Sequence, residues 1–232
     1  LAEYLENPSG TRDGVVETLG TWLTEKETRE NSTVQLVAAI IYQREDLQKE
    51  AFTALKKQGT MEQTALWAQM CLQINRCDLA EQSFKKLESI DEDATLTQLV
   101  GAWINLHKGG DNTKEAAYTY EELIDKFGSS LTLLNGLAVA KMHQKDYDEA
   151  QKRLQEALGK KSDDADALIN LITCGAHMGK EEKEINRYQQ LLYGAHPNHP
   201  YVVNMKAKEA EFDRLAAEYL EKEGLEEDAE GN

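Results

Sequence analysis

The amino-acid sequence predicts an all-α protein built from repeated helical hairpins, and three observations carry that prediction. The chain of 232 residues contains 25 Ala and 28 Leu, but only 8 Val, 9 Ile and three Pro. Ala and Leu favour helices, whereas the β-branched residues that build sheets are scarce. A small residue recurs every 29 to 36 positions, and the apolar residues near it follow the helical spacing i, i+3, i+4, i+7.

The recurring small residue is alanine, at positions separated by 29, 36 and 34 residues: Ala51, Ala80, Ala116 and Ala150. A large residue follows each of them four positions later, in the order Leu55, Phe84, Tyr120 and Leu154. The alanine is needed where two helices cross, because a bulky side chain there would force them apart. A helix–turn–helix unit with a period near 34 is the signature of tetratricopeptide (TPR) repeats.

Five helix pairs are expected in order along the chain. They fall at residues 32–43 and 46–57, 61–73 and 77–88, 95–107 and 112–127, 131–143 and 147–159, and 165–178 and 181–194. The fourth pair shows the pattern most clearly, because Leu134, Leu137 and Ala138 share one face of its first helix. The apolar face of its second helix consists of Tyr147, Ala150, Leu154 and Ala157.

Both ends of the array need separate elements. Residues 13–29 are expected to form the second helix of an incomplete repeat. The segment His196–Pro200 holds two prolines and predicts a break, because proline cannot continue a helix interior. A helix over 201–221, with Met205, Lys208, Phe212, Leu215 and Tyr219 along it, is then expected to cap the last apolar face. The sequence thus predicts a TPR-like solenoid over residues 1–221, wound as a right-handed superhelix, and an acidic tail over 222–232 that we expect to be disordered.

Charge narrows the classes of partner. The sequence has 26 Lys and Arg against 42 Asp and Glu, a net charge of −16. Nucleic acids and anionic membranes bind through clustered Lys and Arg, so neither is expected as a direct partner. No apolar run of about 18 residues predicts a membrane span. The first residues resemble no signal peptide and lack an initiator Met, so we expect a chain that is processed or lacks its N-terminal part.

The sequence offers no constellation for catalysis, a cofactor or a metal. His196 and His199 are three residues apart, but no cysteine is near them, and a zinc site needs about four ligands. The three cysteines, Cys71, Cys77 and Cys174, are expected to be free thiols in a reducing compartment. No glycine-rich phosphate loop and no nucleophile elbow is present. The tryptophans are expected to pack in the core: Trp22, Trp67 and Trp103.

Binding of a polypeptide is the remaining function. A TPR array exposes a concave face, which the first helix of each pair lines. With Leu131 as position one of its helix, the inward positions are two, five, nine and twelve. Together with the positions taken as equivalent in the other first helices, this predicts a neutral, partly apolar partner-binding face: Leu36, Ile40, Gln69, Leu72, Gln98, Asn105, Asn135, Val139, Met142 and Ile169. Such a face suits a polypeptide held by apolar anchors and amide hydrogen bonds.

Several segments resemble the epsilon subunit of the COPI vesicle coat. They are Asn31–Leu36, Ile90–Leu99, Leu133–Gly136, Asn186–Tyr188 and Ala207–Leu215, of which the run Asp-Glu-Asp-Ala-Thr-Leu-Thr-Gln-Leu from Asp91 is the most specific. The resemblance covers residues 31–219 and implies that the chain lacks the family's N-terminal part. It implies a non-enzymatic coatomer subunit without cofactor or metal. That subunit would bind and stabilise the C-terminal region of alpha-COP, and through it the rest of coatomer, in Golgi-to-ER and intra-Golgi vesicle transport.

The same resemblance implies a cytoplasmic protein, peripheral on Golgi membranes and COPI-coated vesicles, whose membrane contact is indirect. The alternative is a TPR adaptor or co-chaperone that binds an extended segment of another protein. A co-chaperone of the carboxylate-clamp type grips an acidic C-terminus with Lys, Arg and Asn at inward positions. Only Asn105, Lys108 and Asn135 are candidates for that role here. An enzyme on a helical scaffold is a further alternative, for which no constellation was found.

Overall fold

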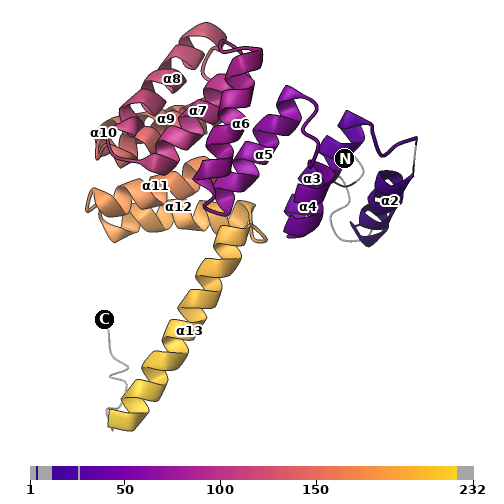
Figure 1. Ribbon diagram of the computed structural model, residues 1–232. Helices are drawn as coiled ribbons and strands as arrows, with labels where there is room; N and C mark the ends of the chain where they lie inside the picture. Colours follow the sequence, from indigo (N-terminus) through magenta and orange to yellow (C-terminus); the bar gives the residue numbers. More distant parts are fainter. Residues whose placement is uncertain (1–3, 5–11, 26, 224–232) are drawn as a thin grey trace. The chain divides into compact units, whose positions relative to one another are not determined.

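The structure is a computed structural model that describes residue 4, residues 12–25 and residues 27–223. The chain divides into two compact units, Leu1–Gly128 and Ser129–Asn232. The described residues form helices joined by turns and loops, without a strand (Figure 1). This all-α architecture agrees with the fold class that the sequence predicts.

Among the described residues of the first unit, three helix pairs follow the helix α2. Their bounds are α2 Arg12–Thr24, α3 Ser32–Arg44, α4 Gln48–Ala54, α5 Met61–Gln73, α6 Cys77–Ile90, α7 Thr95–Lys108 and α8 Asn112–Phe127. The second unit contains α9 Leu131–His143, α10 Tyr147–Lys160, α11 Ala165–His177, α12 Glu182–Ala195 and α13 Pro200–Glu223. Most bounds lie within two residues of the prediction, but α2 and α4 are shorter than expected.

Four of the hairpin turns share one hydrogen bond. In each, the residue directly after the turn's left-handed position donates its backbone N–H to a carbonyl near the end of the first helix: Leu47 N–H donates to Tyr42 C=O, and Lys180 N–H donates to Gly175 C=O. The same bond closes the α5–α6 and α9–α10 turns. One residue of each turn has a positive φ, in the order Asp46, Asn75, Lys145 and Gly179. The tight turn brings the two helices of a pair together in antiparallel packing.

Helix starts are fixed by side-chain caps. The Asn31 side chain accepts hydrogen bonds from the backbone of Thr33 and Val34, so the triplet Asn31-Ser32-Thr33 begins α3. Thr60 and Gln63 form a capping box at the start of α5. Such caps satisfy backbone N–H groups that have no partner within the helix. Ser130 and Asp164 cap α9 and α11 in the same way, whereas Ala94 gives α7 no side-chain cap. Caps therefore explain why the starts of α3, α5, α9 and α11 are predictable to the residue.

The small–large pattern forms the core. Ala51, Ala80, Ala116 and Ala150 all have an exposed fraction of 0%. Three of the large residues that follow are also buried, and the fourth, Phe84, is half-buried against the core of the first unit. Burial raises the pKa of the Tyr120 hydroxyl to about 12. The alanines therefore lie at the helix crossings, as predicted.

Two predictions about packing need correction. Trp67 and Trp103 pack against the core, but Trp22 is 44% exposed, because the side of α2 that carries it has no neighbour among the described residues. The terminal helix α13 caps the apolar face mainly through its first turn, where Tyr201 and Val202 pack with α11 and α12. Further along α13, Lys206 and Glu209 contact Tyr193 of α12. The remaining apolar residues predicted along it are mostly exposed: Phe212, Leu215 and Tyr219. Of the predicted acidic tail, only residues 222 and 223 are described, and they end α13.

Candidate partner-binding faces

The first helices share one frame of burial. Counted from the first residue of α3, α5, α7, α9 and α11, position eight is buried in every case: Ala39, Ala68, Ala102, Ala138 and Ile172. Position eight is thus where each first helix meets its neighbours. Positions five, nine and twelve lie together on one face, since successive residues turn by about 100°. We call this set of positions the first-helix face of each unit.

In the first unit, four predicted residues lie on this face. Leu36 and Ile40 occupy positions five and nine of α3, and Gln69 and Leu72 occupy positions nine and twelve of α5. Gln69 is exposed and the other three are half-buried. Gln43, at position twelve of α3, donates a hydrogen bond to Gln73 of α5 over 2.6 Å, which ties the two helices together along the same side.

The two residues predicted on α7 lie one position before the first-helix face. Gln98 and Asn105 occupy positions four and eleven, about 120° round the helix from the first-helix face. They line a groove whose walls are the second helices α6 and α8. Gly101 and Ala102 are both small, so spacing alone does not show which of them meets the neighbouring helices. Burial selects Ala102, so the face of α7 consists of Leu99, Trp103 and Leu106, all half-buried.

In the second unit the predicted residues share the face. Val139 and Met142 on α9 and Ile169 on α11 are half-buried at positions nine, twelve and five. These apolar side chains are therefore partly available to a partner.

Asn135 lies beside them at position five of α9 but is only 9% exposed. Its Nδ2 donates to Oδ1 of Asp164 over 3.0 Å, and the same oxygen caps α11 by accepting from Ala167 N–H. Among the described residues, Asn135 Oδ1 has no hydrogen-bond partner. Asn135 thus joins α9 to the start of α11 and leaves one buried acceptor unpaired.

The side chains that could support chemistry are not arranged for it. Burial is the main reason that the pKa of Cys71 is raised to about 11, and burial also raises the pKa values of Cys77 and Cys174. Thiols with raised pKa values are poor nucleophiles near neutral pH, because the thiolate is the reactive form and little of it is present. Within the described part of the chain, no cluster of three His, Cys, Asp or Glu residues could hold a metal ion. The helices described there also include none with the length and hydrophobicity needed to cross a bilayer.

Solved structures place this architecture in the TPR class. A tetratricopeptide repeat protein from Parabacteroides merdae superposes with a TM-score of 0.65 at 14% identity, over 82% of this chain and 80% of its own. The pilus biogenesis factor PilW gives a TM-score of 0.63 at 16% identity, over 88% of this chain and 94% of its own. At such low identity these likenesses define the fold alone.

Sequence comparison identifies the family within that class. The family model for the coatomer epsilon subunit matches residues 1–220. Coatomer subunit epsilon-1 of Arabidopsis thaliana is 35% identical over 214 residues, which cover 92% of this chain and 72% of the relative. Coatomer subunit epsilon of Caenorhabditis elegans is 34% identical over 217 residues, 94% of this chain and 74% of the relative. The chain belongs to the coatomer epsilon subunit family and is a coatomer component.

Proposed function

We propose that this chain is a non-catalytic subunit of the COPI coat that binds and stabilises the C-terminal region of alpha-COP through its first-helix faces. The observation that carries the proposal is the half-buried apolar lining of those faces in a chain that belongs to the epsilon family. In this role the protein is cytoplasmic and peripheral on Golgi membranes and COPI-coated vesicles. It serves Golgi-to-ER and intra-Golgi transport, and its contact with the membrane is made through the coat.

The composition of the faces favours a polypeptide as the ligand. In the first unit the residues are Leu36, Ile40, Gln69, Leu72, Leu99, Trp103 and Leu106, and in the second they are Asn135, Val139, Met142 and Ile169. None of them is charged, although the chain carries a net charge of −16. Covering half-buried aliphatic and aromatic side chains removes apolar surface from water, which stabilises a complex by about 25 cal/mol for each Å² of apolar area buried. The unpaired Oδ1 of Asn135 can accept a hydrogen bond from a backbone N–H of the partner.

A carboxylate clamp of the co-chaperone type is not supported. Lys108 Nζ pairs with Glu81 Oε1 over 2.7 Å, and Asn135 donates to Asp164. Asn105 lies in the groove between α6 and α8, away from the first-helix face. Two of the three candidates therefore already bind acidic side chains, and the third faces a different groove. Among these residues, no set of cations converges on a position that a terminal carboxylate could occupy.

Co-expression with the C-terminal region of alpha-COP tests the proposal. We expect a stoichiometric complex on a sizing column. The double substitution Leu36→Glu with Val139→Glu should abolish it, because each change places a charge on the apolar face of one unit. The matched control is Ile90→Glu with Leu191→Glu, which changes two apolar residues that are 57% and 48% exposed, again one in each unit.

The control should retain the complex, and circular dichroism should show unchanged helix content for both double variants. An intact complex with Leu36→Glu and Val139→Glu would overturn the assignment of the first-helix faces. Failure of the unaltered chain to form any complex would overturn the choice of partner.

A further inference from the structure

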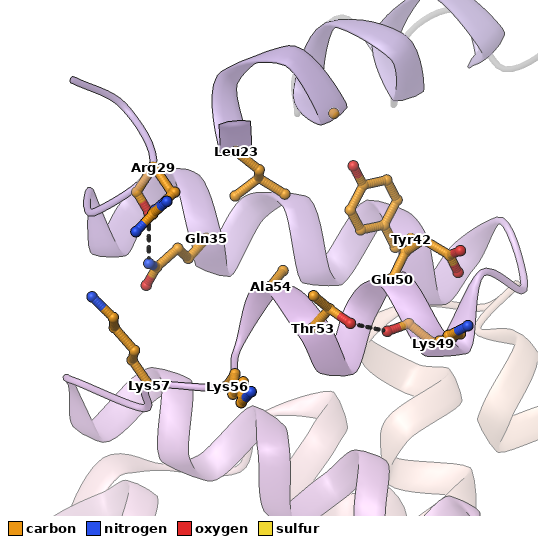
Figure 2. Close-up of a pocket in the computed structure, with 11 residues that line it drawn as sticks. Leu23, Arg29, Gln35, Tyr42, Lys49, Glu50, Thr53, Ala54, Lys56 and Lys57 are labelled. Carbon is orange, nitrogen blue, oxygen red and sulfur yellow. Dashed lines mark hydrogen bonds between the residues drawn. The ribbon is translucent and has the colours of Figure 1, made fainter. Parts of the chain in front are cut away.

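The first unit contains a groove that the proposed function does not use. It lies between α2 and α4, with α3 beneath, and has a volume of about 490 Å³ (Figure 2). We call it the α2–α4 groove. Its lining residues are Gly20, Leu23, Arg29, Gln35, Tyr42, Lys49, Glu50, Thr53, Ala54, Lys56 and Lys57. On α3 it contacts positions four and eleven, Gln35 and Tyr42, so it lies away from the first-helix face.

The middle of the groove is apolar and contains one unpaired polar group. Leu23 and Ala54 flank it, and the Tyr42 hydroxyl points toward α2 (Figure 2). Tyr42 is only 5% exposed, and no hydrogen bond to its hydroxyl is found within the described part of the chain. The hydroxyl borders the open groove and is therefore available to donate or accept a hydrogen bond with a ligand there.

The charges of the groove oppose those of the chain. Four cations and one anion line it, whereas the chain as a whole carries −16. Lys57 pairs with Glu30 over 3.1 Å at the surface, and Glu50 lies near Tyr42. Arg29, Lys49 and Lys56 form no ion pair with the described residues. Even after the Lys57–Glu30 pair is discounted, the groove keeps an excess of positive charge.

A corresponding groove elsewhere in the unit shows that this charge is not a general feature of the repeat. That groove lies between α6 and α8, and Gln98 and Asn105 of α7 occupy the same positions, four and eleven. Its lining holds four acids and no cation: Glu88, Glu92, Asp93 and Glu122. Its volume is about 250 Å³, and Phe84 lies close to Gly101 in it. The α2–α4 groove presents Gly20 on its α2 wall and is correspondingly larger.

We propose that the α2–α4 groove docks an extended acidic segment of another polypeptide, with one bulky apolar side chain between Leu23 and Ala54. Arg29, Lys56 and Lys57 lie toward one end of the groove and Lys49 toward the other (Figure 2). Cations spread along an apolar groove match carboxylates distributed along a peptide better than one compact phosphate group. Complementary charge also speeds encounter and selects the partner.

Fluorescence anisotropy with a labelled synthetic peptide, Glu-Glu-Asp-Leu-Phe-Asp-Glu, tests the proposal on the full chain. We expect saturable binding that weakens at least tenfold between 50 and 300 mM salt, because exposed charges are screened. A peptide with Lys in place of each acid should not bind. Inositol hexakisphosphate should weaken peptide binding no more than sulfate does at the same ionic strength, because the groove is expected to prefer a peptide to a compact phosphate.

Matched variants locate the binding. Lys56→Glu with Lys57→Glu should weaken it at least tenfold, and Gly20→Leu should abolish it by filling the groove. The control, Lys160→Glu with Lys161→Glu, makes the same change at two consecutive exposed lysines of the second unit. Equal affinity of the Lys56/Lys57 variant and its control would overturn the proposal, as would equal binding of the acidic and basic peptides.

One further variant separates an external partner from the chain's own acidic end. Glu226→Gln with Glu227→Gln and Asp228→Asn should leave the affinity of the peptide within twofold. A tenfold gain would show that the chain's own tail occupies the groove, and would overturn the assignment to another polypeptide. The inference is independent of the proposed function, because the Lys56/Lys57 variant should keep the alpha-COP complex intact.

Discussion

At the scale of single residues, the repeat depends on alanine at the helix crossings, and its core also contains buried thiols of low reactivity. Ala150 has an exposed fraction of 0%, and so have Cys71 and Cys174, whereas Cys77 is half-buried. Close packing leaves no room for added atoms at such positions. The sequence predicted these positions because the small–large spacing repeats. Gln98 and Asn105 on α7 lie one position before the first-helix face, because two adjacent small residues satisfy the same pattern and only burial distinguishes them.

Enlarging the alanine at a crossing should destabilise the second unit. Ala150→Leu should lower the free energy of unfolding by about 1–3 kcal/mol, because the longer side chain must push α9 and α10 apart. The control Gln155→Leu changes an exposed position of the same helix and should stay within about 0.5 kcal/mol. Urea denaturation followed by circular dichroism measures both. Equal stability of the two variants would contradict the crossing role of Ala150.

The thiols should differ in reactivity. At pH 8 a thiol with a pKa of about 11 is ionised in roughly one molecule in a thousand, so Cys71 should react slowly with a disulfide reagent. Cys174 should also be protected by burial, and Cys77 should react first. Mass spectrometry of partly labelled native protein measures the order, and the reaction of Cys71 should accelerate as pH rises toward its pKa. Rapid labelling of Cys71 in native protein at pH 8 would show that it is not buried.

At the scale of elements, caps and turns decide where each helix begins and ends. The predicted starts at 61, 95, 112, 131, 147 and 165 agree with the structure, because a capping side chain or a turn residue marks most of them in the sequence. Whether the apolar face of a helix is buried by a neighbouring element was harder to predict. Periodicity gives the apolar face of α2 and α13, but whether a neighbour covers it depends on tertiary packing, which explains the exposure of Trp22 and Phe212.

Two glycines of the second unit should respond to alanine with opposite signs. Gly179 has φ +66 in the α11–α12 turn, so Gly179→Ala should destabilise by about 1 kcal/mol. Gly159 lies in the last turns of α10 with ordinary helical backbone, so Gly159→Ala should stabilise by about 0.5–1 kcal/mol. A Cβ at either site meets no atom within 4 Å, so the backbone alone sets the sign. Thermal unfolding of both variants checks this, and a shift in the same direction would refute the reasoning.

At the scale of the whole molecule, one chain presents surfaces of different chemistry. The first-helix faces are neutral and partly apolar, and the α2–α4 groove is basic although the net charge is −16. The neutral faces could be predicted, apart from α7, because repeat periodicity fixes which positions share a side. The basic groove could not, because its cations are scattered between residues 29 and 57 among acids, and only folding gathers them. The right-handed superhelix stays a prediction of the sequence.

Hydrogen–deuterium exchange of the chain with and without the C-terminal region of alpha-COP tests directly whether the first-helix faces hold the partner. We expect slower exchange in the first helices α3, α5, α7, α9 and α11 on binding, because their faces are covered. The second helices α4, α6 and α10 should exchange as before. Protection confined to the second helices, or no protection at a concentration that saturates the complex, would contradict the claim that the first-helix faces hold the partner.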